Sequence, residues 1–599
     1  MSFNHELAAR FTRAAHLLEL LGEDAFRVNA LARAARTFED HPADLAPIAA
    51  DAAKLRAIPG VGPKIAEKVI EFSRTGTIAE FDELRSRVPA GLPPLLDLPG
   101  LGPKTLAMLW RQGGVTDAAS LRRIIEDGSI LSLPRMGAKS VEKLRQALSF
   151  GQTLGQRQNI GIVLPFAERL ADELRRVPGV RRVEIAGSLR RGRETVADLD
   201  LLAEADDPAA VNQAFRAMPG VRAVLAAGDQ KSSVRIALAG GTSRWGDSPD
   251  IPDIQADLRV VVPGRFGAAL MYFTGSKEHN VLVRERARTL GMTLNEHGLF
   301  REPAETPSDW SKETPVAAAT EEEVFAALGL SLLPPELRES FTSLGAYERH
   351  TPPPTEPISR RDIVSELHAH TTASDGRLAI EELAARAKER GFHTIAVTDH
   401  SRSSVQANGL TIDRLLQHIE HVRQAAERVP GITILAGSEV DILADGTLDY
   451  PDDVLRQLDV VVASPHASLS QDEETCTKRL IAAVEHPLVH ILGHPTGRLI
   501  NRRPGLSPRT AELFAAAARC NTALEINAHW MRLDLRDTHA REALSLGCLI
   551  TIDGDVHKPV DFDNLRYGVL TARRAGLTCE RCPNAWDRPR LLAWLGSKR

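Results

Sequence analysis

The sequence has few of the features that mark secreted or membrane proteins. Its 599 residues include five cysteines, and Cys579 and Cys582 form a single Cys-x-x-Cys pair. Five cysteines are too few for a disulfide framework, and one such pair supplies only half of a zinc site. No apolar run approaches a membrane span, and the N-terminal stretch MSFNHELAARFTRAAHLL is interrupted by charge and lacks a small-residue cleavage site. We therefore expect a cytoplasmic protein with no membrane-bound part.

A strong net charge and a nucleotide-binding P-loop are also absent. The 74 basic and 79 acidic residues leave a net charge of −5, which neither demands nor excludes a nucleic-acid partner. No Gly-Lys dipeptide occurs, which excludes a P-loop. A chain of this length is too long for one hydrophobic core, so several domains are expected.

A repeated motif stands out in the N-terminal region, which is helical in pattern. The segments are IPGVGPKIAEKV (58–69), LPGLGPKTLAML (98–109) and LPRMGAKSVEKL (133–144), with Arg135 replacing the first glycine of the third. Glycines let a backbone approach an anion, and free amides at a helix N-terminus attract phosphate. The pattern resembles the helix-hairpin-helix, which binds DNA backbones without reading bases. The alternative is a helix-packing turn in a protein-protein module. The DNA-binding residues under the first interpretation are Gly60, Gly62, Lys64, Gly100, Gly102 and Lys104.

Carboxylates and arginines meet in the stretch GSLRRGRETVADLDLL (187–202). Asp198 and Asp200 share one face of a predicted strand, and their repulsion calls for a cation between them. A later predicted strand, QADLRVVV, carries Asp257, and three such carboxylates can hold two Mg²⁺ ions. The turn before the first strand offers a backbone amide, a hydroxyl and a guanidinium to phosphates: Gly187, Ser188 and Arg191.

These motifs, with YFTGSKEHN (272–280) and LNEHGLF (294–300), resemble the nucleotidyltransferase core of family X DNA polymerases. The resemblance covers nearly all of residues 1–330. It implies that Asp198, Asp200 and Asp257 bind Mg²⁺ or Mn²⁺, that Asp257 helps activate the primer 3′-hydroxyl, and that Ser188 and Arg191 contact the triphosphate. It also implies that Tyr272, Phe273 and Gly275 shape the sugar pocket, and that Asn280 and Arg284 meet the incoming base and the template side.

One insertion complicates the choice of the third acid. The polar loop AGGTSRWGDSPDIPDI lies just before the QADLRVVV strand and contains Asp247, Asp250 and Asp253. We prefer Asp257 because it alone lies inside an apolar run.

The first hairpin suggests a lyase activity. GVGPKIAEKVIEF is similar to the lyase segment of DNA polymerase beta, and this similarity places Lys68 at the Schiff-base position. The neighbouring Lys64 could lower the pKa of such a nucleophile. The alternative is that both lysines contact phosphate. FRVNALARAA (26–35) keeps the asparagine-alanine pattern but lacks the histidine and tyrosine of the eukaryotic lyase pocket.

From residue 362 onward, strand-like and helix-like segments alternate, which predicts a parallel barrel. The seven strand-like segments are DIVSELH, TIAVTD, ITILAG, DVVVAS, LVHILG, TALEIN and CLITID. Polar residues lie just past their ends, where the active sites of parallel barrels are built. Imidazoles and carboxylates gathered there suit Zn²⁺, Mn²⁺ or Fe²⁺. The expected ligands are His368, His370, Asp375, His400, Glu439, His466, His494, Asp555 and His557, whereas His486, His490, His529 and His539 are assigned ordinary structural roles.

The motifs HAH, TDH, GSEVD, SPH, GHP and DVH resemble the polymerase and histidinol phosphatase (PHP) domain, with all nine ligand positions filled. The match spans residues 362–575 and implies a cluster of three ions. In bacterial family X polymerases this domain is associated with Mn²⁺-dependent 3′-to-5′ exonuclease and 3′-end trimming. Asp399, Asp441 and Asn527 lie beside ligand positions, and we expect them to orient imidazoles.

The sequence thus predicts a multidomain enzyme that fills short gaps during base excision repair and trims 3′ ends. Its expected partners are gapped or primer-template DNA and dNTPs, and it is expected to be a monomer. Two alternatives remain: a DNA-binding PHP phosphoesterase with an inactive polymerase core, and a scaffold without turnover. The expected regions are an N-terminal helical DNA-binding domain (1–88), a fingers-type helical region (89–153), an α+β nucleotidyltransferase palm (154–262), a thumb (263–334), a linker (335–361) and a seven-stranded TIM-like β/α PHP barrel (362–599).

Overall fold

The structure, a computed structural model, divides the chain into two compact units. One unit comprises residues 1–156 with 239–251, and the other comprises residues 157–238 with 252–599. The residues described are 3–39, 45–58, 60–97, 101–134, 136–137, 141, 144–145, 157–238, 253–302, 307, 309–339, 344–348 and 356–598. Within these ranges, no helix is both long and apolar enough to cross a membrane.

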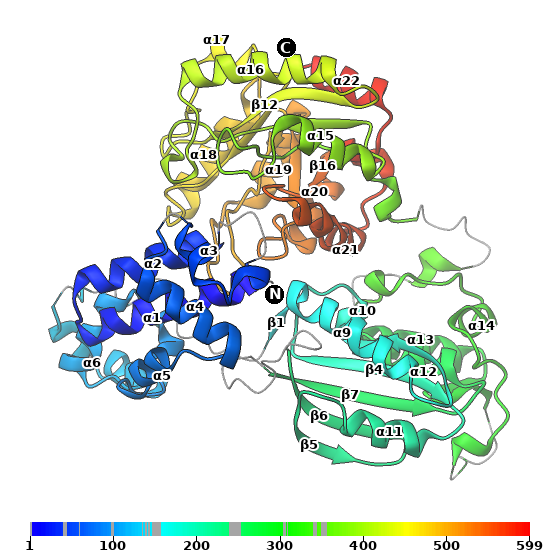
Figure 1. Cartoon of the computed structure of the whole chain (residues 1–599). Helices are drawn as coiled ribbons and strands as arrows, with labels where there is room; N and C mark the ends of the chain where they lie inside the picture. The colour runs from blue at the N-terminus through cyan, green and yellow to red at the C-terminus, as the bar shows by residue number, and fades with distance from the viewer. Residues whose placement is uncertain are drawn as a thin grey trace. The chain divides into compact units, whose positions relative to one another are not determined.

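The first unit is helical, as predicted (Figure 1, blue). Its α-helices are α1 (Phe3–Leu21), α2 (Ala25–Glu39), α3 (Ala52–Arg56), α4 (Pro63–Thr75), α5 (Ala79–Ser86), α6 (Pro103–Gly113) and α7 (Ala118–Glu126), and its 3₁₀ turns are η1 (Ala46–Ile48), η2 (Pro93–Asp97) and η3 (Ser129–Ser132). Helices α4 and α6 start alike, because proline at the first helical position has a preset φ and lacks only an amide hydrogen that would be unpaired there. Each ends at a glycine with positive φ, Gly76 or Gly114.

The second unit begins with a mixed five-stranded palm sheet in the order β2-β4-β7-β6-β5. The elements from this part are β1 (Gln158–Asn159), α9 (Ile160–Arg175), β2 (Val180–Ile185), α10 (Gly187–Arg190), β3 (Thr195–Val196), β4 (Asp198–Ala205), α11 (Pro208–Arg216), β5 (Val221–Ala227), β6 (Lys231–Ala237) and β7 (Asp253–Val261). Strand β7 alternates buried and half-buried residues, so one face packs into the core and the other stays accessible. The start of the neighbouring strand β4 alternates in the same way, so Asp198 and Asp200 lie on the face that solvent can reach.

A smaller thumb region follows the palm. It contains α12 (Phe266–Thr274), α13 (Lys277–Thr289), β8 (Met292–Asn295), β9 (Gly298–Arg301), η4 (Trp310–Lys312), α14 (Glu321–Ala327), η5 (Pro335–Leu337) and η6 (Leu344–Tyr347). A buried ion cluster joins it to the palm, because Glu321 accepts hydrogen bonds from Arg190 at 2.7 Å and from Arg338 at 2.5 Å. Burial alone would raise the pKa of Glu321, but the two arginines outweigh it and hold the pKa at about 2.

We expect Glu321→Gln to destabilise the protein by about 3 kcal/mol or more at pH 7, because it leaves the buried guanidinium of Arg338 and the partly buried one of Arg190 without their carboxylate. The pKa of Glu321 is lower in the folded state than the usual 4.5, so the stabilisation is complete above pH 4.5 and is lost as the pH falls toward 2. The thermal midpoint of the variant should therefore lie well below wild type at pH 7, with a smaller difference at pH 3. The exposed neighbour Glu322→Gln is the control, and an equal shift in both variants would contradict this assignment.

The C-terminal part is the predicted parallel barrel of seven strands in sequential order, enclosed by helices (Figure 1). Its strands are β10 (Ser365–Glu366), β11 (Thr394–Val397), β12 (Thr433–Asp441), β13 (Val460–Ser464), β14 (Ile491–Leu492), β15 (Ala523–Asn527) and β16 (Ile550–Asp553). Its α-helices are α15 (Ile380–Glu389), α16 (Ile412–Arg428), α17 (Asp452–Leu455), α18 (Glu473–Glu485), α19 (Thr510–Cys520), α20 (Asp537–Ser545), α21 (Leu565–Ala575) and α22 (Arg588–Gly596). The 3₁₀ turns are η7 (Arg360–Asp362), η8 (Val405–Ala407), η9 (Pro559–Asn564), η10 (Cys579–Arg581) and η11 (Pro583–Ala585).

The strand ends place the polar residues at one mouth of the barrel. A parallel bridge between Ala369 and Val556 links the segments that follow the first and last strands, so the barrel is nearly closed. Strand β12 is longer than its sequence segment indicates, because its first half pairs with β11 and its second half with β13. Glu439 therefore lies within β12, and the expectation that it follows the strand was wrong.

Candidate active sites

The palm sheet aligns the three expected carboxylates across two neighbouring strands. Strands β4 and β7 are parallel, and their register pairs Asp200 with Asp257 and Asp198 with Gln255. Asp198, Asp200 and Asp257 are all half-buried residues on the accessible side of the sheet. The arrangement leaves three acids close together at one face, which is the geometry of a site for hard divalent cations.

The charge of this group is costly without a cation. Burial, followed by the charges of Asp198 and Asp257, raises the pKa of Asp200 to about 7. The turn that contains Gly187 comes very near, because a Cβ atom at Gly187 would lie 1.9 Å from Oδ2 of Asp200. Gly187 also has a φ of +62°, so glycine is required on both counts.

Neighbouring polar groups fix the orientation of Asp257. Gln255 donates from Nε2 to Oδ1 at 3.1 Å, and Nζ of Lys231 lies 3.2 Å from Oδ2. Asp253, an alternative third acid, forms ion pairs with Arg235 and Arg222 instead. Asp247 and Asp250 fall outside the described residues. The register therefore favours Asp257 as the acid that faces Asp200.

The expected nucleotide-binding residues gather around the ends of α10 and α12. Arg191 donates from Nε to Glu339 at 3.1 Å and from Nη1 to the carbonyl of Thr274 at 2.5 Å, beside Gly275. Asn280 donates to the carbonyl of Tyr272 at 2.7 Å. These contacts bring Arg191 and the proposed sugar-pocket residues together. The remaining members lie nearby. Ser188 is the second residue of α10, the Phe273 ring packs on Tyr272, and Arg284 donates to the carbonyl of Asn280.

The two hairpins present glycines and lysines at exposed helix starts. Gly62 and Gly102 are the N-caps of α4 and α6, and neither would meet an atom within 4 Å if a Cβ were added. Gly60 has a φ of +89°, and Lys64 and Lys104 are exposed. Gly100 and Arg135 lie outside the described residues. The accessible amides at both helix starts suit a phosphate.

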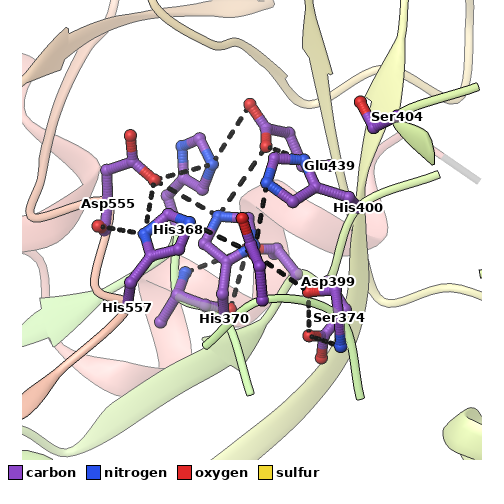
Figure 2. A network of polar contacts seen from close by, with 12 residues as sticks. His368, His370, Ser374, Asp399, His400, Ser404, Glu439, Asp555 and His557 are labelled. Carbon is purple, nitrogen blue, oxygen red and sulfur yellow. Dashed lines mark hydrogen bonds and ion pairs between the residues drawn. The ribbon is translucent and has the colours of Figure 1, made fainter. Parts of the chain in front are cut away.

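The barrel mouth brings the expected metal ligands together (Figure 2). Three groups have ligand atoms that lie within 4.8 Å of one another. Glu439 is at the centre, with its carboxylate 2.8 Å from His400 and 2.8 Å from His494. The three groups are His370, Asp375, His400 and His557; His368, His370 and Asp555; and His400, Glu439 and His466.

The donor set fits metal ions better than a self-satisfied polar network. Nδ1 of His370 and Nδ1 of His494 are buried and have no hydrogen-bond partner among the described residues, and Nε2 of His368 and Nε2 of His370 face carboxylates at 3.4 and 3.2 Å. His494 and Asp555 also have positive φ values of 26° and 52°. Such backbone conformations are unfavourable for residues other than glycine and are concentrated at functional sites.

The protonation of the imidazoles depends on which carboxylates surround them. Burial, reinforced by His557 and His400, lowers the pKa of His370 to about 4. Burial also acts to lower the pKa of His466, but Glu439 and Asp441 outweigh it and raise the pKa to about 10. His466 is therefore protonated in the metal-free protein, and metal binding there must release a proton.

Further polar residues behind the ligands hold them in place. Asp441 lies 2.5 Å from Nδ1 of His466, and Asn527 donates to Asp555 at 3.0 Å. Asp399 instead accepts hydrogen bonds from Thr371 and Ser374 and contacts His418. These contacts tie Asp399 to the loop that follows His370 and to helix α16.

The sequence interpretation missed two residues at this site. Glu525 is fully buried and lies 2.6 Å from Nδ1 of His368, and Arg532 lies 3.7 Å from Asp555. Glu525 interrupts the apolar strand TALEIN two residues before Asn527, so both side chains point to the same side of the strand. An acid at that position in the sequence could therefore have been predicted to belong to the site. Arg532 is in a connecting segment without such a pattern. His490 has the ordinary role expected, with both ring nitrogens bonded to backbone groups.

Comparisons with known proteins match four regions of the chain. Residues 2–78 match a helix-hairpin-helix domain, 92–149 a SAM-like helix-hairpin-helix tandem, 269–339 a DNA polymerase beta thumb, and 366–529 a PHP domain. Together with the palm sheet and the ligand-rich barrel mouth, these matches define a family X polymerase core joined to a PHP domain.

A curated relative extends the match over 95% of the chain. The DNA polymerase/3′-5′ exonuclease PolX of Bacillus subtilis (strain 168) is 37% identical over 568 residues, which is 95% of each chain. A probable phosphatase of Thermoanaerobacter sp. (strain X514) is 28% identical over 227 residues, covering 36% of this chain and 88% of that protein. The chain belongs to the bacterial family X DNA polymerases that carry a C-terminal PHP domain.

Proposed function

We infer that the chain is a DNA polymerase with a 3′-to-5′ exonuclease in its PHP barrel, and we propose that it fills short gaps during base excision repair. The observation that carries the polymerase assignment is the β4-β7 register, which sets Asp200 opposite Asp257 beside the turn that bears Arg191. The similarity to PolX over 95% of both chains supports the same activity. The alternative of an inactive polymerase core leaves this aligned acid triad without a role.

In the palm, we propose that Asp198, Asp200 and Asp257 hold Mg²⁺ or Mn²⁺. Divalent ions at such a site neutralise phosphate charge and favour attack by a hydroxyl oxygen. Ser188 and Arg191 would bind the triphosphate, and Asp257 would orient the primer 3′-hydroxyl. The side chains at the end of α12 and on α13 would enclose the nucleotide: Tyr272, Phe273, Gly275, Asn280 and Arg284.

In the barrel, we propose that the nine expected ligands hold three ions. Eight of them form the three groups of converging ligand atoms, and the ninth, His494, lies 2.8 Å from Glu439 of the third group. Imidazole nitrogens and carboxylate oxygens suit Mn²⁺, Zn²⁺ or Fe²⁺. Glu439 would contribute carboxylate oxygens to the metal site, since both of its oxygens face imidazoles. Arg532 beside Asp555 adds a positive charge that would attract the phosphodiester at a 3′ end.

For the DNA, we propose that Gly60, Gly62, Lys64, Gly102 and Lys104 of the two hairpins, with Gly100, contact the backbone of gapped DNA. Contacts of this kind are independent of sequence and weaken as salt rises. We propose a monomer that acts in the cytoplasm on DNA and dNTPs. The region boundaries at residues 88, 153, 262, 334 and 361 remain part of this proposal.

The test is a labelled primer on DNA with a one-nucleotide gap, with Mn²⁺ and with or without dNTPs. The expected result is addition of the nucleotide complementary to the template when dNTPs are present, and shortening from the 3′ end when they are absent. Shortening without any addition would leave only the phosphoesterase interpretation. Neither activity at any divalent ion would leave only the scaffold.

We also propose that Lys68 serves as a lyase nucleophile. Its Nζ lies 2.5 Å from Glu80, so attack on a sugar aldehyde requires the amine to leave this ion pair and lose a proton. With borohydride and DNA carrying a 5′-deoxyribose phosphate, wild type should form a covalent adduct, and Lys68→Ala should reduce it by at least about tenfold. Lys64→Ala is the control for phosphate binding, and equal trapping in Lys68→Ala and wild type would reject this role.

A further inference from the structure

The turn that bears the nucleotide-binding groups, residues 187–194, is contacted by the PHP barrel at its distal end and at its middle. Arg498 of the barrel donates from Nη1 and Nη2 to the two carboxylate oxygens of Glu194, at 3.1 and 2.6 Å. Leu570 of α21 packs so closely on Gly192 that an added Cβ would lie 3.1 Å from it. Gly192 also has a φ of +67°. We call residues 187–194 the phosphate turn.

Arg574 of α21 makes the most direct contact with the phosphate turn. It donates from Nη1 to the backbone carbonyl of Arg191 at 2.8 Å and to Glu339 at 3.0 Å. Its Nε donates to Asp537 of α20 at 2.8 Å. The Arg574 side chain is only 3% exposed, so these acceptors are its immediate surroundings. A buried guanidinium with two carboxylates and a carbonyl is held in one orientation.

Glu339 transmits this contact to the side chain of Arg191. Its Oε1 accepts from Nε of Arg191 at 3.1 Å and also from Arg574 at 3.0 Å. The barrel thus fixes both the backbone and one edge of the side chain of Arg191. Holding a ligand-binding group in place beforehand reduces the ordering cost that the ligand must overcome.

We propose that Arg574 of the PHP barrel is a positioning residue for nucleotide addition, acting through Glu339 and the backbone of Arg191 to preorganise the triphosphate site. This proposal rests on the proposed function, because it assigns Arg191 to the triphosphate. The barrel then has a second role that is separate from hydrolysis, since Arg574 lies on α21 and outside the ligand set. Nucleotide addition depends on a residue contributed by the nuclease domain.

The competing interpretation is that Arg574 merely attaches the barrel to the palm. The same helix offers a matched control for this, because Arg566 forms an ion pair with Glu168 of α9. That pair joins the same two parts of the chain without any contact to the phosphate turn. If attachment alone mattered, removal of either arginine would have the same effect.

The experiment measures kcat and KM for the dNTP in filling a one-nucleotide gap, with 3′ shortening measured in parallel. We expect Arg574→Ala and Glu339→Gln each to raise the KM by about tenfold, with a smaller change in kcat and shortening within about twofold of wild type. Arg574→Lys should recover part of the loss, since it keeps the charge but not the planar fork. Arg566→Ala should leave the KM within about twofold. Calorimetry of dNTP binding to each variant in complex with dideoxy-terminated gapped DNA should rank the variants in the same order.

Several outcomes would overturn the proposal. Arg574 would be only a structural contact if the KM for the dNTP were unchanged in Arg574→Ala, or if it rose equally in Arg574→Ala and Arg566→Ala. The same conclusion would follow if Arg574→Ala lost addition and shortening in parallel. Arg191→Ala separates this from the proposed function. A raised KM in Arg191→Ala with none in Arg574→Ala rejects only the barrel's part, whereas an unchanged KM in Arg191→Ala rejects the triphosphate role of Arg191 and the proposal with it.

Discussion

Asp200→Asn should abolish primer extension and leave 3′ shortening intact. Asp200 faces Asp257 across the β4-β7 pair and lies against the turn at Gly187. Its replacement by a neutral amide removes a charged oxygen ligand without changing the shape of the site. We expect a loss of about 10³-fold or more in kcat for nucleotide addition, equivalent to about 4 kcal/mol of lost transition-state stabilisation. Single-gap extension with Mg²⁺ measures this, and the same preparation should shorten a 3′ end at the wild-type rate.

The same substitution should stabilise the metal-free protein. Burial and the charges of Asp198 and Asp257 raise the pKa of Asp200 to about 7, above its usual 3.8. A carboxyl whose pKa is raised on folding destabilises the fold as the pH rises from 3.8 through 7. In the presence of a chelator at pH 8, the thermal midpoint of Asp200→Asn should exceed that of wild type, with the difference narrowing toward pH 4. A gain in stability together with a loss of extension cannot come from misfolding.

Two further aspartates provide the controls. Asp206, just past the end of β4, is paired with Arg181, and Asp253, at the start of β7, is paired with Arg235. Asp206→Asn and Asp253→Asn should keep extension within about threefold of wild type, since each carboxylate is held in an ion pair with an arginine. Loss of extension in Asp253→Asn, with activity retained in Asp257→Asn, would transfer the third metal ligand to Asp253. Full extension by Asp200→Asn would reject the palm site altogether.

The sequence predicted best those elements in which apolar residues recur with one clear spacing along the chain. Alternation in ADLDLLAE placed Asp198 and Asp200 on one face, and seven short apolar segments gave the seven strands of the barrel. The bounds were less accurate. Strand β12 extends through Glu439 because the stagger of the barrel shifts its second half onto β13, a long-range effect that no local pattern contains.

Contacts between distant segments could not be predicted from the sequence. Arg574 and Glu339 are separated by more than 200 positions, and both occur among ordinary charged residues with no motif around them. The sequence marks Glu525 as an acid within an apolar strand, but it does not show that Glu525 contacts His368. Motifs mark ligands because the ion demands specific donors, whereas the residues that orient those donors depend on how the chain folds.

Glu439→Gln should abolish 3′ shortening and leave nucleotide addition unchanged, the reverse of the palm variant. The Glu439 carboxylate is 1% exposed and lies within 3.4 Å of four imidazoles, those of His368, His400, His466 and His494. An amide keeps the volume but loses the charge and one of two acceptor oxygens. We expect bound metal to fall and Mn²⁺-dependent shortening to drop by about 10³-fold or more.

Residues behind the ligands should give smaller losses in the same direction. Asp441 orients His466 at 2.5 Å, and Glu525 orients His368 at 2.6 Å. Asp441→Asn and Glu525→Gln should each reduce shortening or metal affinity by about 10- to 100-fold, the range for partners that orient metal ligands. Higher Mn²⁺ should restore part of the rate in these two variants, because they retain every ligand atom.

The exposed Glu427→Gln on α16 is the matched control and should behave as wild type in both assays. Elemental analysis of the purified chain gives a readout that is independent of turnover. If Glu439→Gln kept its metal and shortened DNA normally, the barrel mouth would not be the nuclease site. If it lost addition and shortening together, the two centres would not be separable. Loss of shortening and metal alone, with Asp441→Asn intermediate, places hydrolysis at the cluster centred on Glu439.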